Sequence, residues 1–180
     1  MDAQGALLKH FVAAIAYRTQ KALRGAPDSF ADFRAGVNIR TPHEIIWHMT
    51  GVLGYARTFF QAGVWQPDRL DDIGDEVRRF HLVLEDLGSL LERETPRHGV
   101  SLEQLLQGPL ADAMTHAGQL AMLRRLAGSP VPPENFVYAT IHASNLGPDQ
   151  AAPAAPDPGW NPDLPPRAPG IGLPEKWYQK

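Results

Sequence analysis

Apolar residues recur at steps of three and four along most of the first 129 residues, and this spacing predicts amphipathic helices. The predicted helices cover about residues 3–24, 42–62 and 71–94, and from either 102 or 109 to 127. The stripes expected to face the core are Leu7, Phe11, Ile15 and Ala22; Ile45, His48, Val52, Tyr55 and Phe59; Ile73, Val77, Phe80, Leu84, Leu87 and Leu91; and Ala113, His116, Leu120, Leu123 and Ala127. The run FVYATI is the one short candidate strand. We predict no β-sheet from it, because a sheet needs more than one strand.

Residues that favour helix ends stand where the periodic pattern begins and stops. Thr41 and Glu44 fit a capping box, with Pro42 in the first helical position between them. Arg124 and Arg125 lie in the last turn of the fourth predicted helix, where positive charge complements the helix dipole. Glycines follow three of the predicted helices, at Gly25, Gly63 and Gly128.

Helices of similar length predict an all-α fold, a four-helix bundle over residues 1–129. The connection over 63–70 is short, whereas the connections over 25–40 and 95–108 are longer. We expect the apolar stripes to meet in one core.

The last part of the chain differs in composition. Twelve of the 17 prolines lie between residues 130 and 174, so residues 130–180 are predicted to form a Pro-rich extended tail. We expect this tail to pack on the bundle or on a partner subunit, with Trp160 and Trp177 as its anchors.

Composition narrows the classes of partner. A net charge of −3 gives no reason to expect nucleic acid, because phosphate binding needs a basic surface. No window approaches the ~20 apolar residues of a membrane helix, and the N-terminus lacks a secretory pattern, so we expect a cytoplasmic location. There is no cysteine, which excludes thiolate ligands. Any metal must therefore be held by nitrogen and oxygen atoms.

Three polar residues fall on faces that should be apolar. His48 lies within the stripe of the second predicted helix, and Asp112 lies one turn before His116 in the fourth. Imidazole and carboxylate groups bind divalent cations such as Zn²⁺, Ni²⁺ or Fe²⁺, and three protein ligands leave a position open for water or substrate. The alternative is that Asp112 orients His116 or pairs with an arginine, because the spacing alone is common.

Other residues are candidates for supporting roles. His43, in the first turn of its helix, is expected at the surface near the rim of the site. His81 and Glu85, one turn apart, are candidates for contacting a ligand histidine and fixing its tautomer. Trp47 and Trp65 could line a pocket, although core filling is the favoured role. Close helix packing is the expected reason for the glycines inside helices, Gly51, Gly54 and Gly118.

Two stretches, RTPHEIIWHMTGVLGYARTFF and DAMTHAGQLAMLRRLAGSPVPPENF, resemble the DinB/YfiT-like superfamily of metal-dependent four-helix bundles. The resemblance covers about residues 5–136. It implies that His48 is the ligand from the second helix, and that His116 and Gln119 match the end of the family's last motif. Asp112 stands where the family has the first histidine of an HxxxH pair. This departure either keeps a site of two histidines and one carboxylate or marks a site that has lost its metal.

The resemblance implies a metal-dependent enzyme acting on a small molecule. The expected reactions are transfer to or from a low-molecular-weight thiol, and hydrolysis. The resemblance also makes a homodimer plausible. The alternative is a non-catalytic bundle with a stress-associated or interaction role, favoured by the altered histidine pair and by the lack of an obvious general base beyond Glu85.

Overall fold

The computed structural model describes residues 2–163. Within that range the regular structure is helical, with one isolated β-bridge between Glu134 and Pro156 and no strand. The helices are α1 (Ala3–Leu23), α2 (Pro42–Thr58), α3 (Ile73–Glu92), the short α4 (Leu102–Leu105) and α5 (Ala111–Leu126). None of the helices in the part of the chain that the structure describes is both long and apolar enough to cross a membrane.

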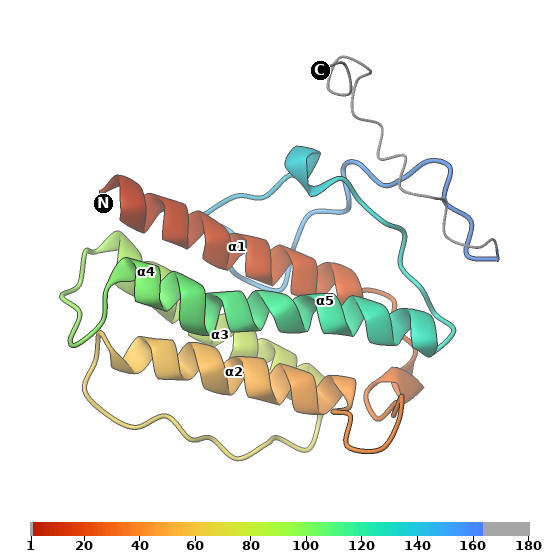
Figure 1. The fold of residues 1–180 in the computed structure, drawn as a ribbon, viewed down its shortest axis with the longest axis horizontal. Helices are drawn as coiled ribbons and strands as arrows, with labels where there is room; N and C mark the ends of the chain where they lie inside the picture. Colours follow the sequence, from red (N-terminus) through yellow and green to blue (C-terminus); the bar gives the residue numbers. More distant parts are fainter. Residues whose placement is uncertain (1, 164–180) are drawn as a thin grey trace, which may run out of the picture.

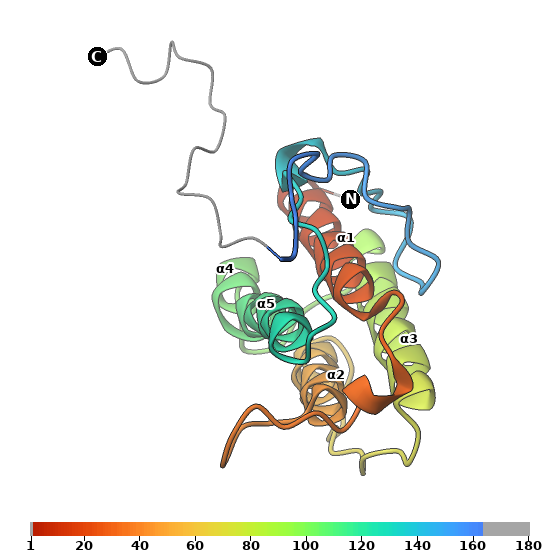
Figure 2. The same ribbon diagram turned by 90° about the vertical axis from the view of Figure 1, so that its right-hand side faces the viewer.

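The four long helices pack side by side, with α1 and α2 at opposite corners when seen end-on (Figure 2). Both α1 and α2 contact α3 and α5. Helix α2 runs opposite to α1, α3 runs in the same direction as α2, and α5 returns parallel to α1 (Figure 1). A hydrogen bond from His98 N to Phe59 O joins the segments that follow α2 and α3 at one end of the bundle. The predicted all-helical fold with bundle-like packing is confirmed.

Because α2 and α3 are parallel, residues 59–72 cross the length of the bundle between them (Figure 1). We call this segment the crossover. The prediction of a short connection over 63–70 does not describe a segment that spans the bundle. Trp65 fixes the crossover on α2, because its indole ring lies so close to Gly54 that a Cβ atom there would overlap it. Trp47 Nε1 also donates a hydrogen bond to Pro67 O, at 2.9 Å.

The predicted core faces are correct for α3 and α5, correct in part for α1, where Ile15 and Ala22 are buried as predicted, and rotated for α2. In α1, Leu7 is 66% exposed, and its neighbour Leu8 is buried. In α2, Tyr55 is 55% exposed, and the buried positions are Ile45, Ile46, Met49, Leu53 and Ala56. Because neighbouring positions are both apolar, two apolar stripes shifted by one residue fit the sequence equally well. The spacing of apolar residues therefore did not show which stripe faces the core. The stripe through His48 and Tyr55 faces a cavity instead of the core.

The predicted helix ends are largely confirmed. Thr41 and Glu44 form the expected capping box. Gly25 and Gly128 follow the ends of α1 and α5 with positive φ angles of 62° and 72°, which favour glycine. Helix α2 ends at Thr58, before the predicted end near residue 62, so Gly63 lies in the crossover and not at the end of the helix. Each of the two proposed starts of the fourth predicted helix corresponds to a helix in the structure. Helix α4 begins at Leu102, and α5 follows a π-helical segment over Leu106–Leu110. That segment contains Pro109 and the non-helical Gly108.

The described part of the tail, residues 130–163, lies along α1 (Figure 1). Leu146 is buried in the core, and the Arg18 guanidinium lies 4.0 Å from the centre of the Phe136 ring. The candidate strand contains a short 3-10 helix instead, Phe136–Tyr138. Of the two predicted anchors, Trp160 is half-buried and Trp177 lies outside the described residues.

Arg124 joins the C-terminal ends of α1 and α5. Its buried guanidinium donates hydrogen bonds to the carbonyl oxygens of Ala22, Arg24 and Gly25, and to both oxygens of Ser129. The sequence pattern predicted only that this charge lies at the end of its own helix. In the structure it also satisfies carbonyl groups that the end of α1 leaves unpaired.

We expect Arg124→Met to lower the free energy of unfolding by about 2–3 kcal/mol, because the carbonyl groups at the end of α1 lose their donor. The neighbouring Arg125 is exposed, so Arg125→Met is the matched control and should change stability by less than about 0.5 kcal/mol. Urea unfolding followed by circular dichroism measures both. Equal stability of the two variants would show that the Arg124 hydrogen bonds contribute little.

Candidate metal centre

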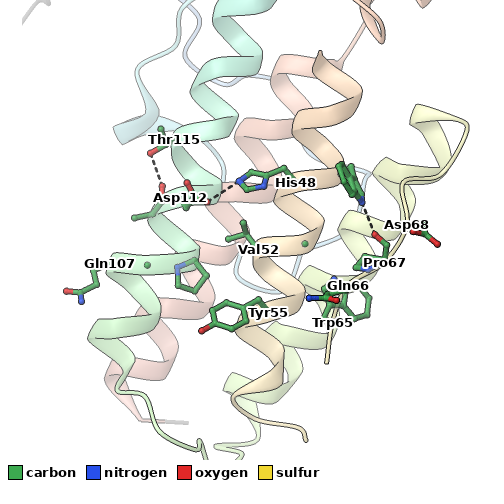
Figure 3. A pocket seen from close by; sticks show the side chains of 15 residues that line it. His48, Val52, Tyr55, Trp65, Gln66, Pro67, Asp68, Gln107, Asp112 and Thr115 are labelled. Atoms are coloured by element: carbon green, nitrogen blue, oxygen red, sulfur yellow. Dashed lines mark hydrogen bonds and ion pairs between the residues drawn. The ribbon is translucent and has the colours of Figure 1, made fainter. Parts of the chain in front are cut away.

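His48, Asp112 and His116 lie together between α2 and α5 (Figure 3 shows His48 and Asp112). One ligand atom from each residue can be chosen so that all three atoms lie within 4.8 Å of one another. Helices α2 and α5 are antiparallel neighbours. The segment Leu106–Leu110 before α5 also packs on α2, so α5 begins partway along α2 and its first turns lie opposite the second turn of α2. The structure therefore brings together the three residues that were predicted as ligands.

The distances within this group suit a cation held between the side chains. His48 Nε2 lies 3.4 Å from Asp112 Oδ2, and His116 Nε2 lies 3.5 Å from Asp112 Oδ1. A tetrahedral ion with bonds of about 2.1 Å separates its ligand atoms by about 3.4 Å. An optimal direct N–H···O hydrogen bond is shorter, about 2.7–3.2 Å. The two separations, which end on different oxygens of Asp112, are close to that length and longer than an optimal hydrogen bond.

Gln119 orients the His116 ring. The side-chain oxygen Oε1 of Gln119 lies 2.7 Å from His116 Nδ1, so that nitrogen carries the hydrogen and donates it. In the neutral ring, His116 Nε2 then presents a lone pair toward the Asp112 carboxylate. Gln119 fixes the tautomer that a metal ligand requires.

The surroundings favour a neutral imidazole at His48. Burial lowers the pKa of His48 below its ordinary value, and the nearby Arg40 and His116 lower it further, while Asp112 acts in the opposite direction. The His48 side chain is 29% exposed and that of Asp112 is 45% exposed. His48 and Asp112 are thus accessible from solvent, whereas His116 is buried.

A cavity of about 1090 Å³ opens beside His48 and Asp112 (Figure 3). Its walls come from α2, from the crossover and from the chain around the π-helical segment, with Trp47, Tyr55, Trp65, Asp68, Gln107 and Pro109 among the lining residues. The favoured prediction of core filling is wrong for Trp47, which is 38% exposed, whereas Trp65 packs against the core and lines the cavity as well. Their position depends on the path of the crossover, which no local sequence pattern predicts.

The predicted position of His43 is wrong, since this residue is buried and not at a surface rim. The segment around Phe30 folds over the start of α2, and His43 N donates a hydrogen bond to Ala31 O. The prediction that His81 contacts a ligand histidine is also wrong, because His81 Nδ1 lies 2.7 Å from Leu146 O. Glu85 lines a separate cavity with residues 144–149. Contacts made by loops and by the tail decide these positions.

Comparison with known proteins does not identify a family. No family model matches the chain, and neither the curated proteins nor the solved structures gave a match. The resemblance to the DinB/YfiT-like superfamily therefore depends on the motifs around His48 and His116, and it stays a prediction.

We expect the protein to lose stability as the pH falls below 6.5, and His81 to contribute to this loss. Burial lowers the pKa of His81 in the folded state, against opposing effects of the Leu146 carbonyl and Asp149. The unfolded state then binds the proton more readily, so protonation favours unfolding. His81→Gln should reduce the fall in unfolding free energy between about pH 7.5 and about pH 5.5. His142→Gln, at an exposed histidine, should leave the fall unchanged. An unaltered pH dependence in His81→Gln would contradict this account.

Proposed function

We propose that this protein is a metal-dependent enzyme that binds one divalent ion through His48, Asp112 and His116. The observation that carries the proposal is the convergence of three ligand atoms within 4.8 Å beside a cavity large enough for a small molecule. A structural metal site is usually closed by four protein ligands, whereas three leave a position for substrate.

The donor set limits the metal. Two imidazole nitrogens and one carboxylate suit Zn²⁺, Ni²⁺ or Fe²⁺, and hard ions such as Ca²⁺ prefer all-oxygen sites. When bound, such an ion acts as a Lewis acid that makes a coordinated thiol or water more acidic. Both reactions implied by the family resemblance, thiol-dependent S-transfer and hydrolysis, use this property.

The residues of the chain have separate roles in this proposal. His48 and His116 supply neutral nitrogen ligands, and Gln119 holds the His116 ring in the required tautomer. Asp112 supplies a negative charge that partly balances the cation, and its side chain borders the cavity. The chain contains no cysteine, so a thiol in the reaction would come from a cosubstrate.

A second candidate is a non-catalytic bundle with a stress-associated or interaction role. Asp112 favours it, because this residue replaces the first histidine of the family's HxxxH pair and is 45% exposed. Without a metal, Asp112 would contact the two histidines only at the distances given above. Metal binding separates the two candidates.

We expect the chelator-treated protein to bind one Zn²⁺ or Ni²⁺ per chain, and His116→Ala and Asp112→Ala each to weaken binding at least about tenfold. Isothermal titration calorimetry measures the affinity, and elemental analysis of the purified protein identifies the metal. His10→Ala and Asp32→Ala remove an exposed histidine and an exposed aspartate, and both should bind as the wild type does. The melting temperature should rise when metal is added to the wild type. Full metal retention in both site variants would leave the non-catalytic bundle as the better account.

Gln119→Leu should weaken metal binding about 10–100-fold although all three ligands are present, because His116 loses the acceptor that fixes its tautomer. Gln119→Glu keeps an acceptor oxygen and should restore most of the affinity. Gln107→Leu, at an exposed glutamine that lines the cavity beside His48 and Asp112, is the matched control. If Gln119→Leu and Gln107→Leu bind metal equally well, Gln119 does not position the ligand.

A further inference from the structure

The cavity beside the candidate metal centre has aromatic walls that the fold holds in place. Trp47 is 38% exposed, and its indole nitrogen is fixed by the hydrogen bond to Pro67 O. Trp65 packs on Gly54, and Tyr55 stacks edge-on against Phe59 with ring centres 4.8 Å apart. Exposed aromatic surface that is already ordered can cover a flat apolar ligand with little loss of side-chain entropy.

The charges on the walls disfavour an anionic ligand. Asp68 and Asp112 contribute carboxylates, and no lysine or arginine is among the described residues that line the cavity. Arg57 lies over the Trp65 ring, but it forms an ion pair with Asp86 at 3.0 Å. Arg40 lines a different cavity, together with His116 and Gln119. Apart from a metal ion held by Asp112, an anionic ring would therefore meet carboxylates without a compensating cation.

Gly51 leaves open space in the cavity, one helical turn from His48. It lies one turn after His48 on α2 and lines the cavity, and a Cβ atom there would meet nothing within 4 Å. Glycine inside a helix costs roughly 0.5–1 kcal/mol relative to alanine. Close helix packing, the expected reason for this glycine, is not observed, whereas open space beside the ligands is.

From these contacts we propose that the cavity binds the uncharged aromatic body of the substrate, against Trp47 and Tyr55, with a polar group of the substrate directed toward His48 and Asp112. This assignment deepens the proposed function and depends on it for the role of the polar group. The selectivity for an uncharged ring depends on the cavity alone.

The test uses two fluorescent probes with the same ring system, N-phenyl-1-naphthylamine and its anionic sulfonate, 8-anilino-1-naphthalenesulfonate. Titration of the full-length protein in the presence of EDTA removes any contribution of a metal. We expect the uncharged probe to bind at least about tenfold more tightly than the sulfonate. Equal affinities, or tighter binding of the sulfonate, would overturn the inference.

Gly51→Leu places a side chain in the cavity and should weaken binding of the uncharged probe at least about tenfold. Gly118→Leu is the matched control, because Gly118 is also a glycine inside a helix where an added Cβ atom would meet nothing within 4 Å, and it lines a different cavity. Unchanged binding in Gly51→Leu would overturn the inference.

A parallel Zn²⁺ titration of the same proteins separates this inference from the proposed function. Gly51→Leu should keep its metal affinity, since it alters no ligand. Selective probe binding in a protein that binds no metal would support the cavity assignment and overturn only the metal proposal. Metal binding without selective probe binding would support the metal proposal and overturn only the cavity assignment.

Discussion

The parallel course of α2 and α3 is the constraint on which the candidate site depends. A helix the length of α2 rises about 26 Å, so the chain must return over that distance before α3 begins. The crossover does so as extended chain without regular structure of its own. It therefore needs attachment points, which Trp65 on Gly54, the Trp47–Pro67 hydrogen bond and the Arg79–Asp68 hydrogen bond provide. These attachments hold the crossover along α2 between Gly54 and Trp47, and this position makes a wall of the cavity.

The antiparallel pair α2 and α5 supplies the chemistry of the site. Each helix is rigid, so the positions of the His48, Asp112 and His116 backbones are fixed before any ligand binds. The Asp112 carboxylate lies between His48 Nε2 and His116 Nε2. Because Gln119 accepts a hydrogen bond from His116 Nδ1, the lone pair of His116 Nε2 is directed toward that carboxylate. Ligand positions held by helices and ordered by a further hydrogen bond are the features that give a metal site its affinity and geometry.

The sequence predicted what local chemistry determines. Helix ends were predictable because capping residues act within one turn, as at Thr41 and Gly128, and the Asp112–His116 spacing lies within one helix. The convergence of His48 with that pair involves a second helix, and the family motifs suggested it. The core face of α1 was ambiguous because Leu7 and Leu8 are both apolar. The positions of His81, His43 and Trp65 follow from the tail, the α1–α2 connection and the crossover, whose paths depend on contacts between distant residues.

Mutations in the crossover can change the cavity without changing the residues of the candidate metal centre. Trp65 and Pro67 are partly buried, while Val64, Gln66 and Asp68 alternate with them and are exposed, as expected for extended chain with one side against the bundle. Of these exposed residues, Gln66 and Asp68 line the cavity, so mutations there alter its wall without moving a helix. A lineage of such proteins can therefore change the lining of the cavity while the three residues of the candidate metal centre are inherited unchanged.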